Sequence, residues 1–321
     1  MDKNYNGVVE DPRSEEEKAR DYKHEDLAMG EIPLNWIEYN EKNLKSYIIQ
    51  NQDGSLSCVA QGTDKILGMH EVKEGREYKR LCPKFIYDLR ANYPDGGMYL
   101  PNALEIACKH GACEESLLPC DNKGEAFMND KSLITNAMTE NAKLYKGKYY
   151  FQITGGIDKI AEVMEMGYGV LLGFRFDYDE WLDVPVLKAG SKLALGHGVA
   201  GVDYCLYNGE KAIVIEDSWG PLYGKGGRRI ITESFLNARN FYAGYITSLP
   251  NYIFEKTLRF GSKGLDVKML QQKLNEKGYI LKVDGAFGRM TQLAVEKFQK
   301  SKGLVADGIV GKKTNAELNK L

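Results

Sequence analysis

The sequence predicts an α+β fold with two lobes, one helical and one made of antiparallel strands, followed by a small three-helix unit. Helical periodicity dominates to about residue 110, and strand-like apolar runs joined by glycine-rich turns dominate residues 149–232. A self-similar pair of turns follows near the end of the chain. With 321 residues, 43% hydrophobic and 27% charged, the chain is long enough for two cores and has an ordinary globular composition.

Three helices are predicted in the first lobe. A polar, glycine-bearing loop over residues 51–57 leads into apolar residues at helical spacing, so that a helix begins at or near Cys58. A second helix is predicted over Leu81–Tyr93, where the turn cluster Pro94-Asp95-Gly96-Gly97 stops it. The third is predicted over Pro101–His110.

Strands dominate the second lobe, where apolar and aromatic runs are bounded by glycine-rich turns. One helix, over Ile157–Met166, interrupts them. The predicted strands cover residues 149–153, 169–174, 199–207, 211–216 and 228–232. A catalytic cleft between two such lobes is the natural place for a site.

The last 66 residues contain an internal repeat. Asp284–Thr291 and Asp307–Thr314 each combine a tight Asp-Gly turn with a helix start, 23 residues apart. An amphipathic helix with Leu265, Leu270 and Leu274 on its inner face precedes them. A small three-helix core is therefore predicted here, in which the aspartates and glycines form turns rather than contact a ligand.

Charge is unevenly distributed along the chain. Residues 255–321 hold 14 Lys and Arg against 7 Asp and Glu, whereas the remainder holds 29 against 38. A basic module on an acidic body favours a polyanionic partner, for which nucleic acid and bacterial cell wall are both candidates at this point. A merely solvated basic face is the ordinary alternative.

Targeting and membrane signals are weak in this sequence. No run of 18 apolar residues occurs, so no membrane partner is predicted. No apolar segment follows the polar start Met1–Asn6, so we expect synthesis in the cytoplasm without a signal peptide.

The six cysteines do not have the spacing of a disulfide scaffold, which favours synthesis in a reducing compartment. Cys108, His110, Cys113 and Cys120 contain zinc-ligating atom types, but their spacing matches no common structural zinc site. No metal and no other cofactor is predicted.

Cys58 is the first candidate for chemistry. Unpaired N–H groups at a helix N-terminus favour a thiolate, which is the nucleophilic form of cysteine. Of four histidines, His197 lies between two glycines at the entry to a strand, where a second group can approach its ring. Asp217 follows 20 residues later, at the end of the next strand and close to Trp219. The ordinary alternative is that Cys58 is a small buried hydrophobic residue.

Taken together, these segments resemble the papain-like cysteine peptidases over about residues 32–250, in the same order along the chain. Each motif alone is weak, and their order makes the resemblance specific. The matching segments are Ile32–Trp36, which resembles the start of the mature enzyme, Gln52 with Cys58, the glycine-rich substrate wall Asp95–Met98, His197–Val202 and Asp217–Gly220.

The resemblance implies a role for each of these residues. Cys58 would be the nucleophile and His197 the general base and acid. Gln52 and the backbone N–H of Cys58 would form the oxyanion hole. Asp217 would accept a hydrogen bond from Nδ1–H of His197, and Trp219 would shield that contact from water.

Three further residues would line the substrate site together with Trp219, according to the same resemblance. Gly96 and Gly97 belong to the substrate wall, where the backbone of Gly97 would pair with an extended peptide. Met98 would line the pocket for the residue before the scissile one.

Asp217 departs from the family, which usually has asparagine at this position. A carboxylate stabilises the imidazolium more strongly than an amide does, so we expect a raised pKa for His197 and an alkaline activity limb shifted upward. The alternative is that Asp217 is a structural residue at a strand end and that the enzyme is crippled.

Residues 256–321 resemble the peptidoglycan-binding domain of many bacterial and phage wall enzymes. The resemblance depends on the two Asp-Gly repeats, on Leu265–Val267 and on Ala294–Gln299. The predicted domains are thus a polar N-terminal arm (1–31), a peptidase domain (32–250) and a wall-binding domain (256–321). The arm is expected to lie on the body or to be disordered, and it is too short to resemble the usual inhibitory propeptide.

These resemblances predict a cysteine endopeptidase targeted to peptidoglycan or another anionic wall polymer, with nucleic acid no longer expected. Its substrate would be the peptide part of peptidoglycan or a protein of the wall or virion. A phage-encoded lysin, acting after lysis, or a virion-associated protease would fit. The rival is a catalytically weak or inactive scaffold that binds the wall. An amidase or zinc hydrolase is disfavoured because the chain lacks a histidine-rich ligand set.

Overall fold

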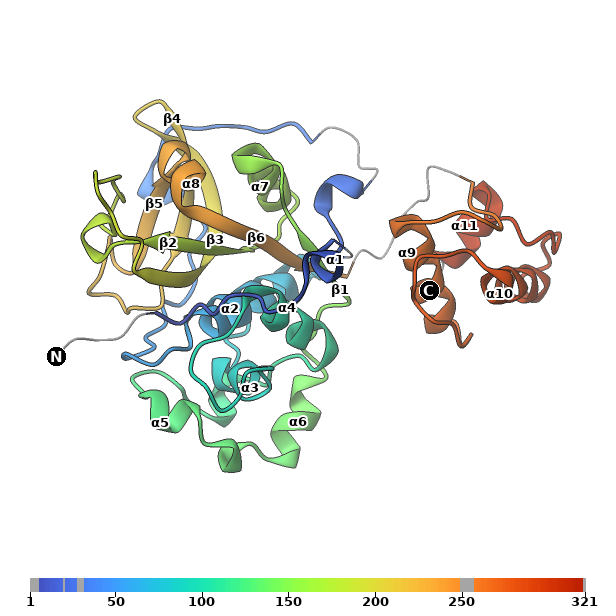
Figure 1. Ribbon diagram of the computed structural model, residues 1–321, viewed down its shortest axis with the longest axis horizontal. Helices are drawn as coiled ribbons and strands as arrows, with labels where there is room; N and C mark the ends of the chain where they lie inside the picture. The colour runs from blue at the N-terminus through green and yellow to red at the C-terminus, as the bar shows by residue number, and fades with distance from the viewer. Residues whose placement is uncertain (1–5, 20, 28–31, 249–256, 320–321) are drawn as a thin grey trace. The chain divides into compact units, whose positions relative to one another are not determined.

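The computed structural model describes residues 6–19, 21–27, 32–248 and 257–319, which form a large compact unit and a small C-terminal unit (Figure 1). The large unit has the predicted α+β architecture of a helical lobe packed on an antiparallel sheet. None of the helices in these residues combines the length and the hydrophobicity that crossing a bilayer requires.

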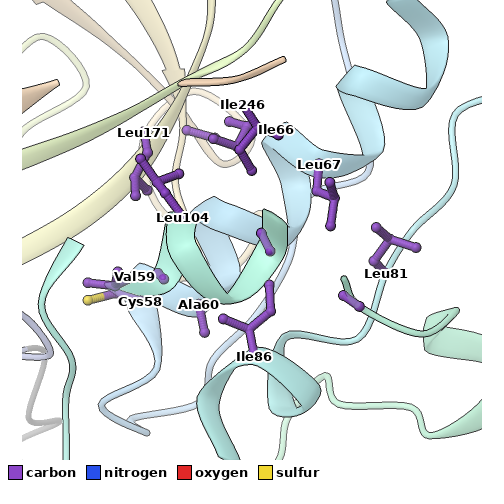
Figure 2. Packing of buried hydrophobic residues seen from close by; sticks show 14 of the residues in the cluster. Cys58, Val59, Ala60, Ile66, Leu67, Leu81, Ile86, Leu104, Leu171 and Ile246 are labelled. Atoms are coloured by element: carbon purple, nitrogen blue, oxygen red, sulfur yellow. The ribbon is translucent and has the colours of Figure 1, made fainter. Parts of the chain in front are cut away.

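Helix α2 is the central element of the large unit, and Cys58 is its first residue. Most of its length is buried, because other elements pack around it. Figure 2 shows Ile66 beside Ile246 of β6 on one side, and Ala60 facing Ile86 of α3 on the other. Gly62 lets the helix approach the sheet, since a Cβ there would lie 2.8 Å from Leu171 Cδ1. The remaining helices of this lobe surround it; the bounds are α2 Cys58–Lys73, α3 Pro83–Asp88, α4 Leu100–Lys109, α5 Glu125–Met128 and α6 Asn136–Ala142.

The sheet has six strands in the order β1-β6-β2-β3-β4-β5, and every neighbouring pair is antiparallel. Strand β2 is almost wholly buried, as its continuous apolar sequence predicts. Strand β6 was not predicted, although it lies between β1 and β2 and pairs with both. The bounds are β1 Tyr149–Gln152, α7 Gly156–Glu165, β2 Val170–Phe176, β3 Leu195–Tyr207, β4 Glu210–Glu216, β5 Arg228–Thr232, α8 Glu233–Arg239 and β6 Asn240–Thr247.

The second predicted helix is shorter than expected: α3 ends at Asp88, and not at Tyr93. The side chain of Arg90 folds back, and its Nη1 donates to the carbonyl of Tyr87 at 2.6 Å. The N–H of Ala91 donates to Asn102 Oδ1 at 2.9 Å instead of continuing the helix. Side chains therefore satisfy the backbone groups that a longer helix would have paired.

Residues 6–19 and 21–25 of the N-terminal arm belong to the large unit, and an arm lying on the body was one of the two expectations. The N–H of Gln152 in β1 donates to the carbonyl of Tyr22 at 2.8 Å. His24, expected in a polar arm, is buried, with Nδ1 3.0 Å from the hydroxyl of Tyr245. The arm also contains the one-turn helix α1, Glu15–Lys18, which has a capping box at Ser14.

The small unit contains α9 Leu265–Glu276, α10 Arg289–Ser301 and α11 Lys312–Leu318, as predicted. Leu270, Leu274 and Leu318 are buried in its core. Each Asp-Gly turn is fixed by a buried glutamine of the preceding helix. Gln271 Nε2 donates to Asp284 Oδ1 at 3.0 Å, and Gln299 Nε2 donates to Asp307 Oδ1 at 2.8 Å. The repeat in the sequence is therefore a repeat of one hydrogen-bond arrangement.

Candidate active site

Cys58 lies at the amino end of α2, against strand β3. The N–H of Gly198 in that strand donates to Cys58 Sγ at 3.5 Å. A side chain at 198 would collide with α2, since a Cβ there would lie 3.0 Å from Val59 Cα. The glycine after His197 thus lets the strand approach the thiol, which is wholly buried.

His197 and Asp217 form a buried pair on the sheet side of this contact. Nε2 of His197 lies 2.8 Å from Asp217 Oδ1. The expectation that Nδ1 would face the carboxylate was wrong, because the ring presents Nε2 to Asp217 and its other edge to Cys58. Burial disfavours the charged ring, but Asp217 and Cys58 outweigh it and raise the pKa of His197 to about 9.

The carboxylate of Asp217 has more partners than the sequence suggested. Its Oδ2 accepts hydrogen bonds from Trp181 Nε1 and Arg229 Nε, each at 2.9 Å. Burial would raise the pKa of Asp217, but His197, Arg229 and Trp181 together hold it well below its usual range. The group is therefore ionised even though it is buried.

Two aromatic side chains cover the His197–Asp217 pair. The ring of Trp219 lies 5.1 Å from that of His197, centroid to centroid, and is buried. Tyr178 stacks on Trp219 at 6.0 Å. This arrangement is consistent with the expected shielding role of Trp219.

Gln52 lies in the same site and connects its two sides. Its backbone N–H donates to the carbonyl of Ser218 at 2.8 Å, and its Oε1 accepts from Ser218 Oγ at 2.6 Å. Its Nε2 donates to the carbonyl of Ser55 at 2.6 Å. An amide nitrogen carries two N–H groups, so this bond uses one of its two donors.

The glycine-rich wall differs from the expectation in one respect. The N–H of Gly97 donates to the hydroxyl of Tyr87 at 2.8 Å, so it does not face an extended peptide. The backbone of the next residue, Met98, does pair with an extended segment of this chain, while its side chain is buried in the core. The other expected wall residue, Gly96, lies against the side chain of Leu56.

That extended segment is the start of the N-terminal arm. The N–H of Met98 donates to the carbonyl of Gly7 at 3.0 Å, and Val9 N–H donates to Met98 O at 3.1 Å, in parallel orientation. On the sheet side, Val8 N–H donates to the carbonyl of Gly196 at 3.3 Å. Figure 1 shows this segment crossing the junction of the helical lobe and the sheet.

Gly7 itself covers the thiol. A Cβ at this position would lie 2.6 Å from Cys58 Sγ and still closer to the carbonyl oxygen of Leu56. Only glycine therefore fits with the arm in place, and the arm explains why Cys58 is buried. Beyond it, a cavity of about 300 Å³ is lined by Val9 of the arm and by Tyr99 and Phe241 of the body.

A hydrogen-bond chain joins the nucleophile loop to the wall. Glu125 accepts from the N–H of Leu56 at 2.7 Å and from the hydroxyl of Tyr87 at 2.8 Å. The same hydroxyl accepts from Gly97 N–H. The two loops that flank the thiol are thus joined through one half-buried carboxylate.

Sequence reasoning missed several of these residues. Trp181, Tyr87 and Glu125 carry no local motif. Arg229 had a weak signal, because it directly precedes two isoleucines in a short predicted strand, where a buried arginine is unusual. Gly7 could not be identified, since its importance depends on where the arm lies.

The cysteine cluster considered for zinc shows no metal-binding group in the residues that the structure describes: no three or more His, Cys, Asp or Glu side chains converge there. Cys82 Sγ lies 3.1 Å from Cys120 Sγ, and both are buried thiols. The contact with Cys113, together with burial, raises the pKa of Cys82, whereas the contact with Cys82, together with burial, raises the pKa of Cys120.

The fold of the large unit is similar to that of solved papain-like cysteine proteases. The structure is similar to xylellain, a cysteine protease from Xylella fastidiosa, with a TM-score of 0.60 and 17% identity over 77% of this chain and 97% of that one. It is also similar to the digestive procathepsin L 3 of Tenebrio molitor larvae, with a TM-score of 0.54 and 17% identity over 71% of this chain and 76% of that one. The predicted papain-like fold is therefore confirmed.

The C-terminal unit has its own relatives. Residues 263–318 match the family described as "Putative peptidoglycan binding domain". The chain is 42% identical over 66 residues to the zinc D-Ala-D-Ala carboxypeptidase of Streptomyces albus G, covering 20% of this chain and 26% of that protein. It is 36% identical over 76 residues to a spore cortex-lytic enzyme of Halalkalibacterium halodurans, covering 23% of each. The chain thus spans about a quarter of the length of these relatives.

Proposed function

We propose that the chain is a cysteine peptidase directed to the bacterial cell wall. The observation that carries the proposal is the buried arrangement of Cys58, His197 and Asp217, in which a thiol at a helix N-terminus meets an imidazole held by a carboxylate. The papain-like fold and the match to a peptidoglycan-binding family support the two halves of the proposal. The predicted domain bounds, 1–31, 32–250 and 256–321, stay part of it.

In the proposed reaction, Cys58 Sγ attacks the carbonyl carbon of the scissile peptide bond. The oxyanion is stabilised by the backbone N–H of Cys58 and by the second N–H of Gln52 Nε2. The imidazolium of His197 gives its proton to the leaving amine nitrogen, which yields a thioester. His197 then takes a proton from water, the resulting hydroxide attacks the thioester, and the thiolate of Cys58 leaves beside the imidazolium.

The substrate that we propose is the stem peptide of peptidoglycan or a wall-associated protein. A basic C-terminal unit would hold the enzyme on an anionic polymer. That the enzyme is a phage lysin or a virion-associated protease stays a prediction of the sequence.

The arm is part of the proposal, because a peptide cannot reach Cys58 while Gly7 lies on it. We infer that residues 6–9 leave this position before substrate binds. The covered thiol also favours a second candidate, an inert scaffold whose C-terminal unit binds the wall, because in that case the arm would never leave.

Labelling of the full chain with a cysteine-directed epoxide separates the two candidates. Gly7→Trp cannot occupy the place above Cys58, so it should displace the arm and allow stoichiometric labelling of Cys58. Wild type should label at about one tenth of that rate or even more slowly, because only the fraction of molecules in which the arm has left Cys58 can react. Ala19→Trp, at an exposed position of the same arm, is the matched control and should behave as wild type.

Mass spectrometry of the labelled peptide identifies the residue that reacts. Labelling should disappear in Gly7→Trp/His197→Ala. A folded Gly7→Trp chain that takes up no epoxide would favour the scaffold. The same variant, incubated separately with purified cell walls and with a peptide library, would then show which bond is cut.

A further inference from the structure

The far side of the site contains a buried ion pair that the reaction scheme does not use. Asp217 is bonded on both oxygens: Oδ1 accepts from His197 and from the N–H of Ser218 at 2.7 Å, and Oδ2 accepts from Trp181 and Arg229. All of these side chains are buried. Arg229 is the single guanidinium that touches the carboxylate among the described residues.

Arg229 is itself fixed rigidly. It lies on β5 opposite Ile215 of β4, and its Nη1 donates to the carbonyls of Trp181 and Leu182 at 2.9 and 2.8 Å. Its guanidinium carbon lies 5.4 Å from the ring centre of Trp181 and 5.3 Å from that of Trp219. Only 2% of its surface is exposed, so its position is fixed and water does not screen its charge.

The charges of the site balance only when Arg229 is counted. A thiolate at Cys58, an imidazolium at His197 and a carboxylate at Asp217 sum to one negative charge in a buried place. An unbalanced buried charge is unfavourable, and a carboxylate without a counter-charge would raise the pKa of the imidazolium further. The guanidinium brings the sum to zero.

We propose that Arg229 is a positioning residue that neutralises Asp217 and orients its carboxylate toward His197, so that an aspartate can serve where a neutral asparagine is usual. The proposal rests on the proposed function, since it assigns a role in the same reaction. The Asp217–Arg229 pair then carries no net charge, although its carboxylate is the member that lies against His197. Arg229 contacts neither the thiol nor the place of the substrate, and it acts through Asp217 alone.

Titration of His197 tests this without any substrate. The chain has four histidines, so histidine labelled with ¹⁵N gives a simple NMR spectrum, and His197→Ala identifies the signal. In Arg229→Met the pKa of His197 should rise by about one unit, because a nearby positive charge is removed. In Asp217→Asn/Arg229→Met it should fall below the wild-type value, because both charges that act through this pair are gone.

Thermal unfolding supplies the second readout. Asp217→Asn alone leaves the guanidinium buried without its carboxylate and should lower the melting temperature. Adding Arg229→Met should recover most of that loss, which is the coupling expected of two groups in one pair. Should Arg229→Met fail to fold, Arg229→Lys keeps the charge and should leave the pKa of His197 near its wild-type value.

A merely structural Arg229 gives a different result. It would lower the melting temperature of Arg229→Met and leave the His197 titration unchanged, and that outcome overturns the proposal. An Asp217→Asn/Arg229→Met chain no more stable than Asp217→Asn would overturn it as well. Because the titration reports charge and not turnover, a chain that never labels with epoxide contradicts the proposed function without altering this test.

Discussion

The two sides of the candidate site are fixed by different interactions. On the helical side, Cys58 is placed by the backbone at the start of α2, and its neighbouring loop is anchored by Glu125 and Tyr87 through hydrogen bonds. On the sheet side, His197 is placed by a chain of buried charges that runs through Asp217 to Arg229. The helical side therefore determines where Cys58 lies, and the sheet side determines the protonation state of His197.

This difference determines what a substitution does on each side. A change on the helical side moves atoms, so it should alter the rate at every pH. A change on the sheet side alters charge, so it should also shift the pH range in which the site is active. The predictions below use this distinction, beginning with the largest expected effect on Cys58 reactivity.

Cys58→Ser removes the nucleophile, which lies on the helical side, and should abolish peptide hydrolysis. We expect peptide hydrolysis by the Gly7→Trp chain to fall by about 1000-fold or more, because a hydroxyl is a far weaker nucleophile at this position. Hydrolysis of a peptide found in the library would measure it. Cys108→Ser, at a half-buried cysteine elsewhere in the lobe, should leave the rate unchanged. Equal losses in both variants would contradict the assignment of Cys58.

The pH dependence should reveal the sheet side. The pKa of His197 is raised to about 9, so the imidazolium persists across neutral pH, and activity should fall only above about pH 9. The raised pKa also contributes to the free energy of unfolding. This contribution is fully present below about pH 6.5, and it is lost as the pH rises through 9. The rate at which the epoxide alkylates Cys58 in the Gly7→Trp chain, measured from pH 6 to 11, would locate this alkaline limb. An alkaline limb at or below pH 7 would exclude the charged pair.

The same distinction explains how far the sequence could be interpreted. Cys58, His197 and Asp217 could be proposed from the sequence because short motifs surround each of them, and the structure places the three side chains close together. The strands were predicted to within a few residues, with β6 missed. Arg229, Trp181 and Gly7 act across strands or from a distant segment, so nothing in their local sequence indicates a partner. The ring edge of His197 was assigned wrongly for a related reason, since the orientation of the ring depends on where Asp217 and Cys58 lie in the fold.

Tyr87→Phe should loosen the helical side without altering charge. It leaves the N–H of Gly97 without its acceptor, which costs about 1–3 kcal/mol of unfolding free energy. We expect a few-fold lower rate of epoxide labelling in the Gly7→Trp chain, with the pH limb unchanged. Tyr93→Phe, whose hydroxyl bonds Asn129 at an exposed place, is the matched control. A shift of the alkaline limb in Tyr87→Phe would contradict the view that only the sheet side controls the pH dependence.

Gln299→Leu should have the smallest effect on the site and the largest on retention at the wall. Its Nε2 donates to Asp307, to the carbonyl of Ile309 and to Thr314, so the change removes the anchor of the second turn. The C-terminal unit should lose about 3 kcal/mol or more of stability, since several buried groups lose their partners together. Labelling of Cys58 in Gly7→Trp should stay within about twofold, because the large unit has its own core. Sedimentation with purified cell walls measures retention, with Ala306→Ser at an exposed position as the control. Loss of labelling together with loss of retention would mean that the large unit depends on the small one for its active arrangement.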